Sequence, residues 1–359
     1  MKKFTGIDSI SPTKSKLEAQ KIAFGPVIFQ VSKIMKDTGI LKIIEDSEDN
    51  GIEIDKIFKQ KKNLSKYSVQ LLLDASISIG LISLNNGKYI LTKTGYFILN
   101  DKITNVHMDF THDVCYQGMF YLDEAIKKRY PAGLKVFGKW ETIYEALSSL
   151  PDNVQKSWFA FDHYFSDMAF PKAIPIVFKE NPKKVLDVGG NTGKWAIQCA
   201  RYSKDVSVTI LDLPGQLKKA EDNIKNNGLI ERISLHAINL LDHTQPFPGG
   251  FDAIWMSQLL DCFSSEDIVE ILKRASLALN DNGFLYILET YPDRQSFDVA
   301  SFCLDMISFY FTCMANGNSR MYNAKFMIEY VKKAGLEIVE DINGVAISHT
   351  LFKCKKRPG

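Results

Sequence analysis

The chain has 359 residues, and its 44 basic and 42 acidic side chains leave a formal charge of +2 at pH 7. Hydrophobic residues make up 45% of it and charged residues 24%, which excludes a disordered chain, a fibre and a disulfide-rich mini-protein. Because the charges balance, we expect neither a nucleic-acid nor a membrane partner.

The amino-terminal segment and the cysteines indicate the compartment. The segment MKKFTGIDSISPTKSK has two lysines but no apolar core behind them, so we expect no signal peptide. No uninterrupted apolar stretch approaches the length of about 18 residues that a bilayer requires. The six cysteines are scattered without a CxxC pair, which favours reduced thiols over a zinc site or disulfides. We therefore expect a cytoplasmic protein without a metal.

Residues 1–100 are expected to form a mainly helical domain. The stretches FGPVIFQVSKIMKDTGILKII and KNLSKYSVQLLLDASISIGLISL repeat apolar residues at helical spacing, the second with Asn63 or Ser65 as its N-cap. The segment LISLNNGKYILT predicts a β-hairpin that turns at residues 85–87. Helices followed by a hairpin indicate a winged helix-turn-helix. Since none of its helices is conspicuously basic, we expect this domain to dimerise rather than to bind DNA.

Two further regions follow. Residues 101–180 are helical and unusually rich in aromatic side chains, some of which suit the wall of a pocket for a flat or apolar ligand. Residues 181–359 alternate strands and helices, which predicts a doubly wound, mostly parallel α/β sheet. The last two strands, LEIVEDI and AISHTLFKCKK, have no helix between them and predict an antiparallel hairpin at one end of the sheet.

A cofactor motif lies where the first strand of this sheet ends. The segment VLDVGGNTG is a buried strand that ends in Asp187 and continues into a tight turn. Ligands of such sheets bind at the carboxyl ends of strands, and Gly189 and Gly190 let the backbone approach a ligand closely. Asn191 tolerates a left-handed conformation better than most residues. The next strand ends in Asp212, which is well placed to bind the two hydroxyls of a ribose.

Two cofactors compete for this turn, a dinucleotide and S-adenosylmethionine. A dinucleotide fold uses GxGxxG to rest a pyrophosphate on a helix N-terminus, and glycines at positions 189, 190 and 193 lack that spacing. Asp187 also suits the ammonium and sulfonium groups of S-adenosylmethionine better than a pyrophosphate. The residues therefore favour S-adenosylmethionine, with a turn that binds no ligand as the remaining alternative.

The segments LDVGGNTG, LDLP and NLLDHTQPFPGGFDAIWM, in the order winged helix, helical linker and catalytic domain, resemble one family. It is the class I S-adenosylmethionine-dependent O-methyltransferases with an amino-terminal dimerisation domain, which act on small hydroxylated aromatic and polyketide-like molecules. The resemblance implies a Rossmann-like methyltransferase sheet and a homodimer. It places Asp187 and Gly189 at the methionine end of the cofactor, Asp212 at the ribose and residues 239–240 at the adenine. The predicted cofactor-binding residues are Asp187, Gly189, Gly190, Asp212, Leu213, Asn239, Leu240 and Ser257.

The catalytic segment departs from the family pattern. The family base is a histidine in a segment similar to LHDWSDE, which here reads LDCFSSE and puts Asp261 at the histidine position. An imidazole with a pKa of about 6.5 matches a phenol better than a carboxylate of about 3.9, unless burial raises the pKa of the carboxylate. Of the two glutamates that support the family histidine, one matches Glu289 and the other falls on Arg320.

Several alternatives follow for the chemistry. In the first, Asp261 is the base that accepts the proton of the hydroxyl group. In the second, that base is a histidine of the helical linker, His163 or His112. Alternatively, the chain binds the cofactor without methylating a hydroxyl, as decarboxylases and hydroxylases of related folds do. A winged-helix regulator that senses a metabolite is the last hypothesis, which the near-neutral amino-terminal region disfavours. The predicted catalytic residues are Asp261, Glu289 and His163, and the predicted substrate-binding residues are His112, Tyr116, Met306, Tyr310 and Arg320.

Overall fold

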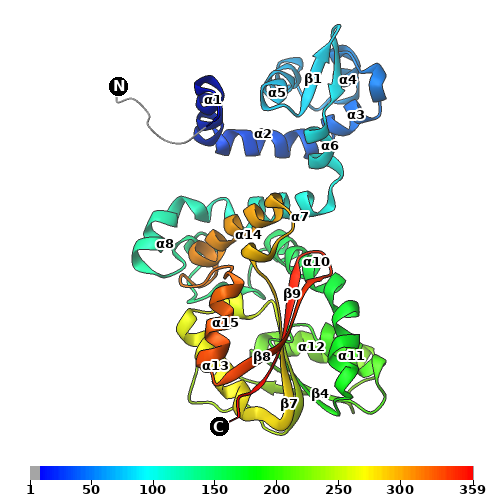
Figure 1. Ribbon diagram of the computed structural model, residues 1–359. Helices are drawn as coiled ribbons and strands as arrows, with labels where there is room; N and C mark the ends of the chain where they lie inside the picture. Colours follow the sequence, from blue (N-terminus) through cyan, green and yellow to red (C-terminus); the bar gives the residue numbers. More distant parts are fainter. Residues whose placement is uncertain (1–8, 359) are drawn as a thin grey trace, which may run out of the picture. The chain divides into compact units, whose positions relative to one another are not determined.

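A computed structural model describes residues 9–358, so the first half of the segment tested for a signal peptide lies outside the described residues. The chain divides into two compact units between Met108 and Asp109 (Figure 1). Most of the aromatic region expected at residues 101–180 belongs to the second unit, together with the sheet.

The first unit is mainly helical. Ser65 caps the amino terminus of α5, because its Oγ accepts a hydrogen bond from the Ser68 amide at 3.0 Å. Asn86 and Gly87 have positive φ angles of 47° and 75°, which the two-residue turn between β1 and β2 requires, so the predicted hairpin is confirmed. The elements are α1 (Pro12–Ala23), α2 (Gly25–Asp37), α3 (Ile40–Glu45), α4 (Ile54–Gln60), α5 (Lys66–Ile79), β1 (Ile82–Asn85), β2 (Lys88–Leu91) and α6 (Lys93–Asn100), with α7 (Lys102–Phe110) at the boundary.

The second unit contains a sheet of seven strands in the order β5-β4-β3-β6-β7-β9-β8. Strands β3 to β7 are parallel, whereas β9 pairs antiparallel with both β7 and β8, which confirms the predicted carboxyl-terminal hairpin. The chain order reverses between β3 and β6, and a ligand-binding crevice is expected at the carboxyl ends of these two strands. The strands are β3 (Lys184–Val188), β4 (Ser207–Asp212), β5 (Ile233–Ala237), β6 (Phe251–Ser257), β7 (Leu279–Thr290), β8 (Leu336–Val345) and β9 (His349–Lys356).

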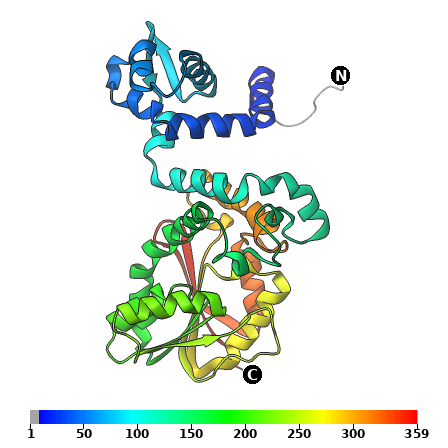
Figure 2. The same cartoon turned by 180° about the vertical axis from the view of Figure 1, so that it is seen from behind.

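Helices cover both faces of this sheet, as its buried central strands require. One hydrophobic core joins the sheet to α10 (Asp152–Val177), α11 (Lys194–Tyr202) and α12 (Pro214–Asn226), the green helices of Figure 2. The other core joins it to α13 (Ser265–Ala278) and α15 (Ala324–Lys333).

A third hydrophobic core forms a cap near the carboxyl ends of the strands. We call residues 109–158 and 298–321 the cap, because these two segments, far apart in the sequence, share this core. The first contributes α8 (Leu122–Lys128) and α9 (Ile143–Ala146), and the second contributes α14 (Asp298–Tyr310) with a π-helical turn at Phe311–Ala315. Helix α10 joins the cap to the sheet, because Trp158 packs in the cap core and Ala173 in the sheet core.

The stretch Asp298–Ala315 is long and apolar enough to cross a membrane by length and composition alone. Of this stretch, 39% is buried in the protein, and the core helix of a soluble protein passes the same test. The chain has no uninterrupted apolar run of about 18 residues. The length and composition of Asp298–Ala315 are therefore weak evidence that this stretch crosses a membrane.

Candidate active site

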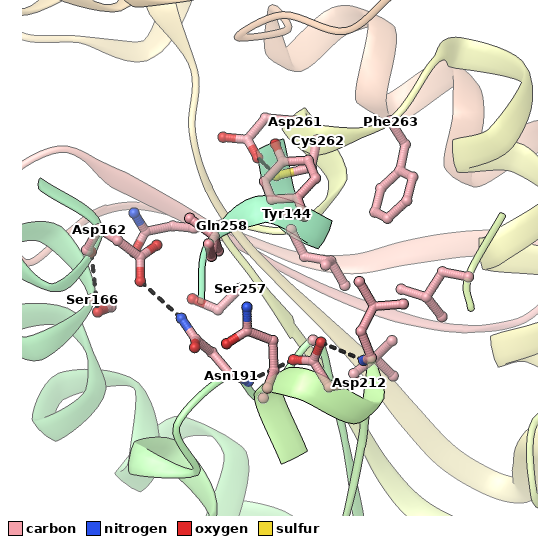
Figure 3. A pocket seen from close by; sticks show the side chains of 18 of the residues that line it. Tyr144, Asp162, Ser166, Asn191, Asp212, Ser257, Gln258, Asp261, Cys262 and Phe263 are labelled. Atoms are coloured by element: carbon pink, nitrogen blue, oxygen red, sulfur yellow. Dashed lines mark hydrogen bonds between the residues drawn. The ribbon is translucent and has the colours of Figure 1, made fainter. Parts of the chain in front are cut away.

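A cavity of about 560 Å³ lies at the carboxyl ends of the parallel strands and extends under the cap (Figure 3). Its strand side is formed by the ends of β3, β4 and β6 and the loops that follow β3, β4 and β5. Its cap side is formed by the cap, by the first half of α10 and by a 3-10 turn after β6 (Leu260–Cys262). All predicted cofactor-binding residues lie on the strand side: Asp187, Gly189, Gly190, Asp212, Leu213, Asn239, Leu240 and Ser257.

The turn after β3 requires its glycines. Gly189 has a φ of +73°, and a Cβ added there would lie 2.5 Å from Leu259 Cδ1. A Cβ added to Gly190 would lie 2.7 Å from Asp187 Oδ2, so any side chain would displace that carboxylate. Asn191 has a φ of 49°, as its tolerance of the left-handed conformation predicts. Because Gly189 and Gly190 have no side chains, the backbone of this turn is accessible from the cavity.

Asp187 is a buried carboxylate, and no cationic side chain of the described residues pairs with it. It is 2% exposed, and its Oδ2 has no hydrogen-bond partner among the described residues. Burial, followed by the charge of Asp212, raises the pKa of Asp187 to about 8. A cationic ligand in the cavity would offset this cost, because an opposite charge nearby favours the ionised carboxylate.

Asp212 is held by the backbone at the end of β4. Its Oδ2 accepts a hydrogen bond from the Asn191 amide at 2.8 Å, and its Oδ1 accepts one from the Leu213 amide at 2.7 Å. Burial raises the pKa of Asp212 to about 6. Each oxygen of an ionised carboxylate accepts more than one hydrogen bond, so Asp212 can also bind a vicinal diol.

The loop after β5 is fixed from behind. Arg274 is 8% exposed and donates hydrogen bonds to the carbonyl oxygens of Leu240, Asp242 and Gln245. The Asp242 carboxylate accepts hydrogen bonds from the Thr244 hydroxyl at 2.6 Å and the Gln245 amide at 2.7 Å, so Asp242 shapes the loop. This framework holds the loop at the edge of the cavity.

The strand side fits S-adenosylmethionine. Asp187 offers a negative charge for its cationic end, Asp212 offers acceptors for the ribose, and the loop at Asn239 and Leu240 borders the remaining space. Among the described lining residues, Lys194 is the one Lys or Arg, and both oxygens of Asp167 hold its Nζ at 2.9 Å. A pyrophosphate would therefore meet carboxylates instead of a free cation.

Asp261 and Glu289 form a buried pair of carboxyl groups. Asp261 lines the cavity, is 6% exposed and accepts a weak hydrogen bond from the Cys262 thiol at 3.4 Å. Glu289 lies behind it, outside the lining, where its Oε1 accepts hydrogen bonds from the Leu259 and Leu260 amides at 3.0 and 2.9 Å. Burial raises the pKa of Asp261 to about 6. Burial and the Asp261 charge raise the pKa of Glu289 well above its usual value, so Glu289 is the member that keeps a proton.

Helix α10 contributes a carboxylate that no sequence motif marks. Asp162 lines the cavity, and its Oδ2 accepts a hydrogen bond from Asn191 Nδ2 at 3.1 Å. Burial, followed by the charge of Asp261, raises the pKa of Asp162 to about 7. The helical spacing of the sequence points to Asp162, because side chains three and four positions apart share one face of a helix. Five residues that line the cavity follow this spacing: Trp158, Phe161, Asp162, Phe165 and Ser166.

Two of the other predicted residues face the cavity. His163 lines it, with its Nε2 3.8 Å from Asp162 Oδ2, and burial lowers the pKa of its imidazole. Tyr310 also lines it, and its hydroxyl accepts a hydrogen bond from Trp158 Nε1 at 2.7 Å.

Four predicted substrate-binding residues do not line the cavity. Nδ1 of His112 lies 2.9 Å from an Asp113 carboxylate oxygen, and both His112 and Tyr116 belong to the cap. Met306 is 49% exposed on the outer side of α14. Arg320 is exposed, and its Nε donates to a backbone carbonyl at 3.5 Å, so it is not placed to hold Asp261 ionised. The packing of the cap decides which of its side chains face the cavity, and position in the sequence alone does not show this.

Comparisons with known proteins agree with this geometry. Residues 16–89 match the Dimerisation2-like domain, and residues 120–337 match the O-methyltransferase domain. The chain is 23% identical to an L-tyrosine C(3)-methyltransferase of Streptomyces lavendulae, over 88% of this chain and 85% of that protein.

Solved structures share the fold. The S-adenosylmethionine-dependent methyltransferase SibL superposes with a TM-score of 0.69 at 22% identity, covering 94% of this chain and 98% of SibL. The O-methyltransferase NcsB1 from neocarzinostatin biosynthesis was solved with S-adenosylmethionine and 2-hydroxy-5-methyl naphthoic acid. It superposes with a TM-score of 0.65 at 18% identity, covering 93% of this chain and 96% of NcsB1.

The O-methyltransferase match covers more than half of the chain and includes most of the residues that line the cavity. The chain therefore belongs to the O-methyltransferase domain family and is an S-adenosylmethionine-dependent methyltransferase.

Proposed function

We propose that this protein methylates a hydroxyl oxygen of a small aromatic molecule and that Asp261 accepts the hydroxyl proton. The observation that carries the proposal is the buried carboxylate of Asp261 on the aromatic side of the cavity, with a pKa of about 6. This value lies close to the imidazole value of about 6.5. Burial thus gives Asp261 the basicity that a histidine would have at the same position.

The strand side would hold the cofactor. Asp187 would bind its cationic methionine end, Asp212 its ribose and the loop of Asn239 and Leu240 its adenine, with Ser257 at the end of β6 beside them. When bound, S-adenosylmethionine supplies an electrophilic methyl group on a sulfonium.

The cap side would prepare the acceptor. Trp158, Phe161 and Tyr310 offer aromatic faces that orient a ring and exclude water. Asp261, ionised above a pH of about 6, takes the hydroxyl proton as the oxygen becomes nucleophilic. Glu289 keeps its own proton and, through the Leu259 and Leu260 amides, fixes the turn that carries Asp261.

A pH–rate profile of wild type, Asp261→Asn and His163→Ala with a panel of simple phenols tests the base. We expect Asp261→Asn to lower kcat by about a hundredfold or more, while the Kd for S-adenosylhomocysteine stays unchanged. The rise in wild-type rate through a pH of about 6 should disappear in this variant. If His163→Ala shows these effects and Asp261→Asn does not, the proton goes to the histidine and Asp261 is not the base.

Methylation of a ring carbon is a second candidate, favoured by the similarity to the L-tyrosine C(3)-methyltransferase. Removal of the phenol proton by Asp261 would also make the neighbouring ring carbons nucleophilic. After such a carbon takes the methyl group, it would lose its own proton to solvent, and the oxygen would regain one from Asp261, which restores the aromatic ring and the hydroxyl. Proton NMR of the methylated product decides between them, because an O-methyl and an aryl C-methyl group resonate at different positions. A product that keeps its free hydroxyl would establish carbon methylation.

We also infer that the protein works as a homodimer, joined through a winged-helix-like domain within residues 1–100. Helix α1 buries none of its residues, and large apolar side chains are exposed on α1, on α2 and at the junction between them, among them Leu17 (55%), Ile22 (81%), Phe24 (58%) and Val27 (58%). The match to the Dimerisation2-like domain covers this surface. Light scattering at micromolar concentration should give twice 40.6 kDa for wild type and 40.6 kDa for an Ile22→Asp/Phe24→Asp variant. A wild-type protein of 40.6 kDa would contradict the dimer.

The six cysteines are free, in agreement with the cytoplasmic location that we propose for this enzyme. Fractionation of cells that produce the protein tests this location, and recovery with the membranes would contradict it.

A further inference from the structure

The cavity is lined by far more acidic than basic side chains. Among the described residues that line it, eight are acidic, and Lys194 is the one lysine. Since Asp167 holds that lysine with both carboxylate oxygens, it does not neutralise the cavity. The acidic lining residues are Glu141, Glu145, Asp162, Asp187, Asp212, Asp242, Asp261 and Asp267.

On the cap side, Glu141 and Glu145 are exposed, whereas Asp162 is half-buried and Asp261 is buried. Figure 3 shows these two aspartates on the side of the cavity away from Asp212, Asp162 on α10 and Asp261 on the turn after β6. They are close enough for the charge of Asp261 to raise the pKa of Asp162. Asp261 is 6% exposed and lines the cavity, whose lining on this side includes aromatic side chains.

Among the described residues, the one cation that acts on Asp162 is Lys194, which is paired with Asp167. From neighbouring elements Asp162 faces Asp261, the Tyr310 hydroxyl and Lys194, and on its own helix it faces Asp167 and the neutral His163. In the described part of the chain, its carboxylate accepts a side-chain hydrogen bond from Asn191. The side chain is 27% exposed, and the exposed part opens to the cavity. A partly desolvated carboxylate in this position is stabilised when a cation binds beside it.

The same wall suits an organic cation. Trp158, Phe161 and Tyr310 line the cavity close to Asp162, and aromatic faces attract cations that have lost their water. An ammonium group attached to an aromatic ring would therefore meet both a carboxylate and π-faces, whereas an anionic substituent would meet only repulsion.

We propose that the methyl acceptor is a phenol that carries a cationic amine, and that Asp162 binds the ammonium group of this acceptor. The proposal rests on the proposed function, in which Asp261 takes the proton of the phenol. Asp162 thereby selects the substrate, and Asp261 activates it. A free amino acid carries a carboxylate that no free cation of the described lining would meet, so an amine is the expected acceptor class.

Binding calorimetry with protein saturated by S-adenosylhomocysteine tests the proposal without turnover. Three amines are compared with isosteres in which a methyl group replaces the ammonium: 2-(aminomethyl)phenol with 2-ethylphenol, 4-(aminomethyl)phenol with 4-ethylphenol, and tyramine with 4-propylphenol. In at least one pair the amine should bind about tenfold or more tightly, as a charge-assisted hydrogen bond predicts. The carboxylate 3-(4-hydroxyphenyl)propionate should bind more weakly than 4-propylphenol.

The variant Asp162→Asn should abolish the preference for the amine. It is isosteric and can still accept the hydrogen bond from Asn191, so the fold is expected to tolerate it. Between pH 6 and 8 the amine should bind more tightly to wild type as Asp162 ionises near a pH of about 7, and this rise should be absent in Asp162→Asn. Asp152→Asn is the matched control, because Asp152 is an exposed carboxylate on the same helix and lies outside the cavity lining.

Equal binding of amine and isostere in all three pairs would overturn the proposal. It would also be overturned if Asp162→Asn weakened the binding of S-adenosylhomocysteine and left the amine preference intact, because Asp162 would then serve the cofactor. If no phenol is methylated although the amines bind through Asp162, the proposed function fails and the amine site stands.

Discussion

The two sides of the cavity differ in how the chain builds them. The strand side comes from short segments at the ends of neighbouring parallel strands, where Asp187 and Asp212 follow directly from local turns. The cap side combines α10, the turn that carries Asp261 and the π-helical end of α14, which long-range packing brings together. The geometry of the strand side therefore follows from local sequence, whereas that of the cap side depends on tertiary packing.

The largest expected effect concerns the stability of the ligand-free protein. The pKa values of Asp187 and Asp162 are raised to about 8 and about 7, so both stabilise the folded state at low pH and lose this contribution as pH rises through these values. From pH 6.5 to 8.5 we expect the free energy of unfolding to fall by about 2 to 3 kcal/mol. Buried His349, with a pKa lowered to about 4, opposes this trend only below its unfolded pKa of about 6.5.

Thermal unfolding across this pH range measures the effect. The decrease in Tm should be smaller in Asp187→Asn, and saturating S-adenosylmethionine should reduce it in wild type. A Tm that stays constant or rises from pH 6.5 to 8.5 would show that these carboxyl groups are not buried in the protonated form.

The second effect concerns the strand side alone. Asp212→Ala should weaken S-adenosylhomocysteine binding by about 1 to 3 kcal/mol, the cost of a lost pair of charge-assisted hydrogen bonds. The control is Asp222→Ala, an exposed position on α12 away from the cavity. Calorimetry that finds the same Kd in wild type and Asp212→Ala would refute the ribose-binding role.

The third effect tests the connection between the two sides. Asn191 donates its backbone amide to Asp212 and its side-chain amide to Asp162. Asn191→Gly keeps the left-handed backbone and removes only the side chain, so it should cost about 0.5 to 1.5 kcal/mol in acceptor binding. We expect KM for the acceptor to rise while the Kd of the cofactor product changes less. A change confined to the cofactor product would place Asn191 wholly on the strand side.

The smallest effect is expected for Tyr310→Phe. This change removes the hydroxyl that accepts the hydrogen bond of Trp158 Nε1 and keeps the ring. Loss of one buried hydrogen bond should lower the stability by about 1 kcal/mol, or Tm by about 2 to 4 °C. Cofactor affinity should not change, and a reduced affinity would mean that the cap also shapes the strand side.

Sequence reasoning succeeded where chemistry follows from local order. The strand, glycine turn and left-handed Asn191 are consecutive, and the hairpin at Asn86 and Gly87 depends on two adjacent residues. Prediction from the sequence failed where burial decides whether a side chain faces the cavity. Asp162 was overlooked because its neighbour His163 has the more familiar chemistry, and Met306 was expected inside although it lies on the outer side of α14.

The hydrophobic core of the cap is distinct from the two cores that stabilise the sheet. Residues such as Val136, Ile307 and Met314 can therefore be exchanged with little strain on the strands that hold the cofactor. Because the cores are separate, the cap is a suitable target for directed evolution. Libraries of variants confined to the cap core would change the shape of the site that binds the acceptor. In a lineage of such enzymes, the same separation allows new substrates to arise without renewed selection for cofactor binding.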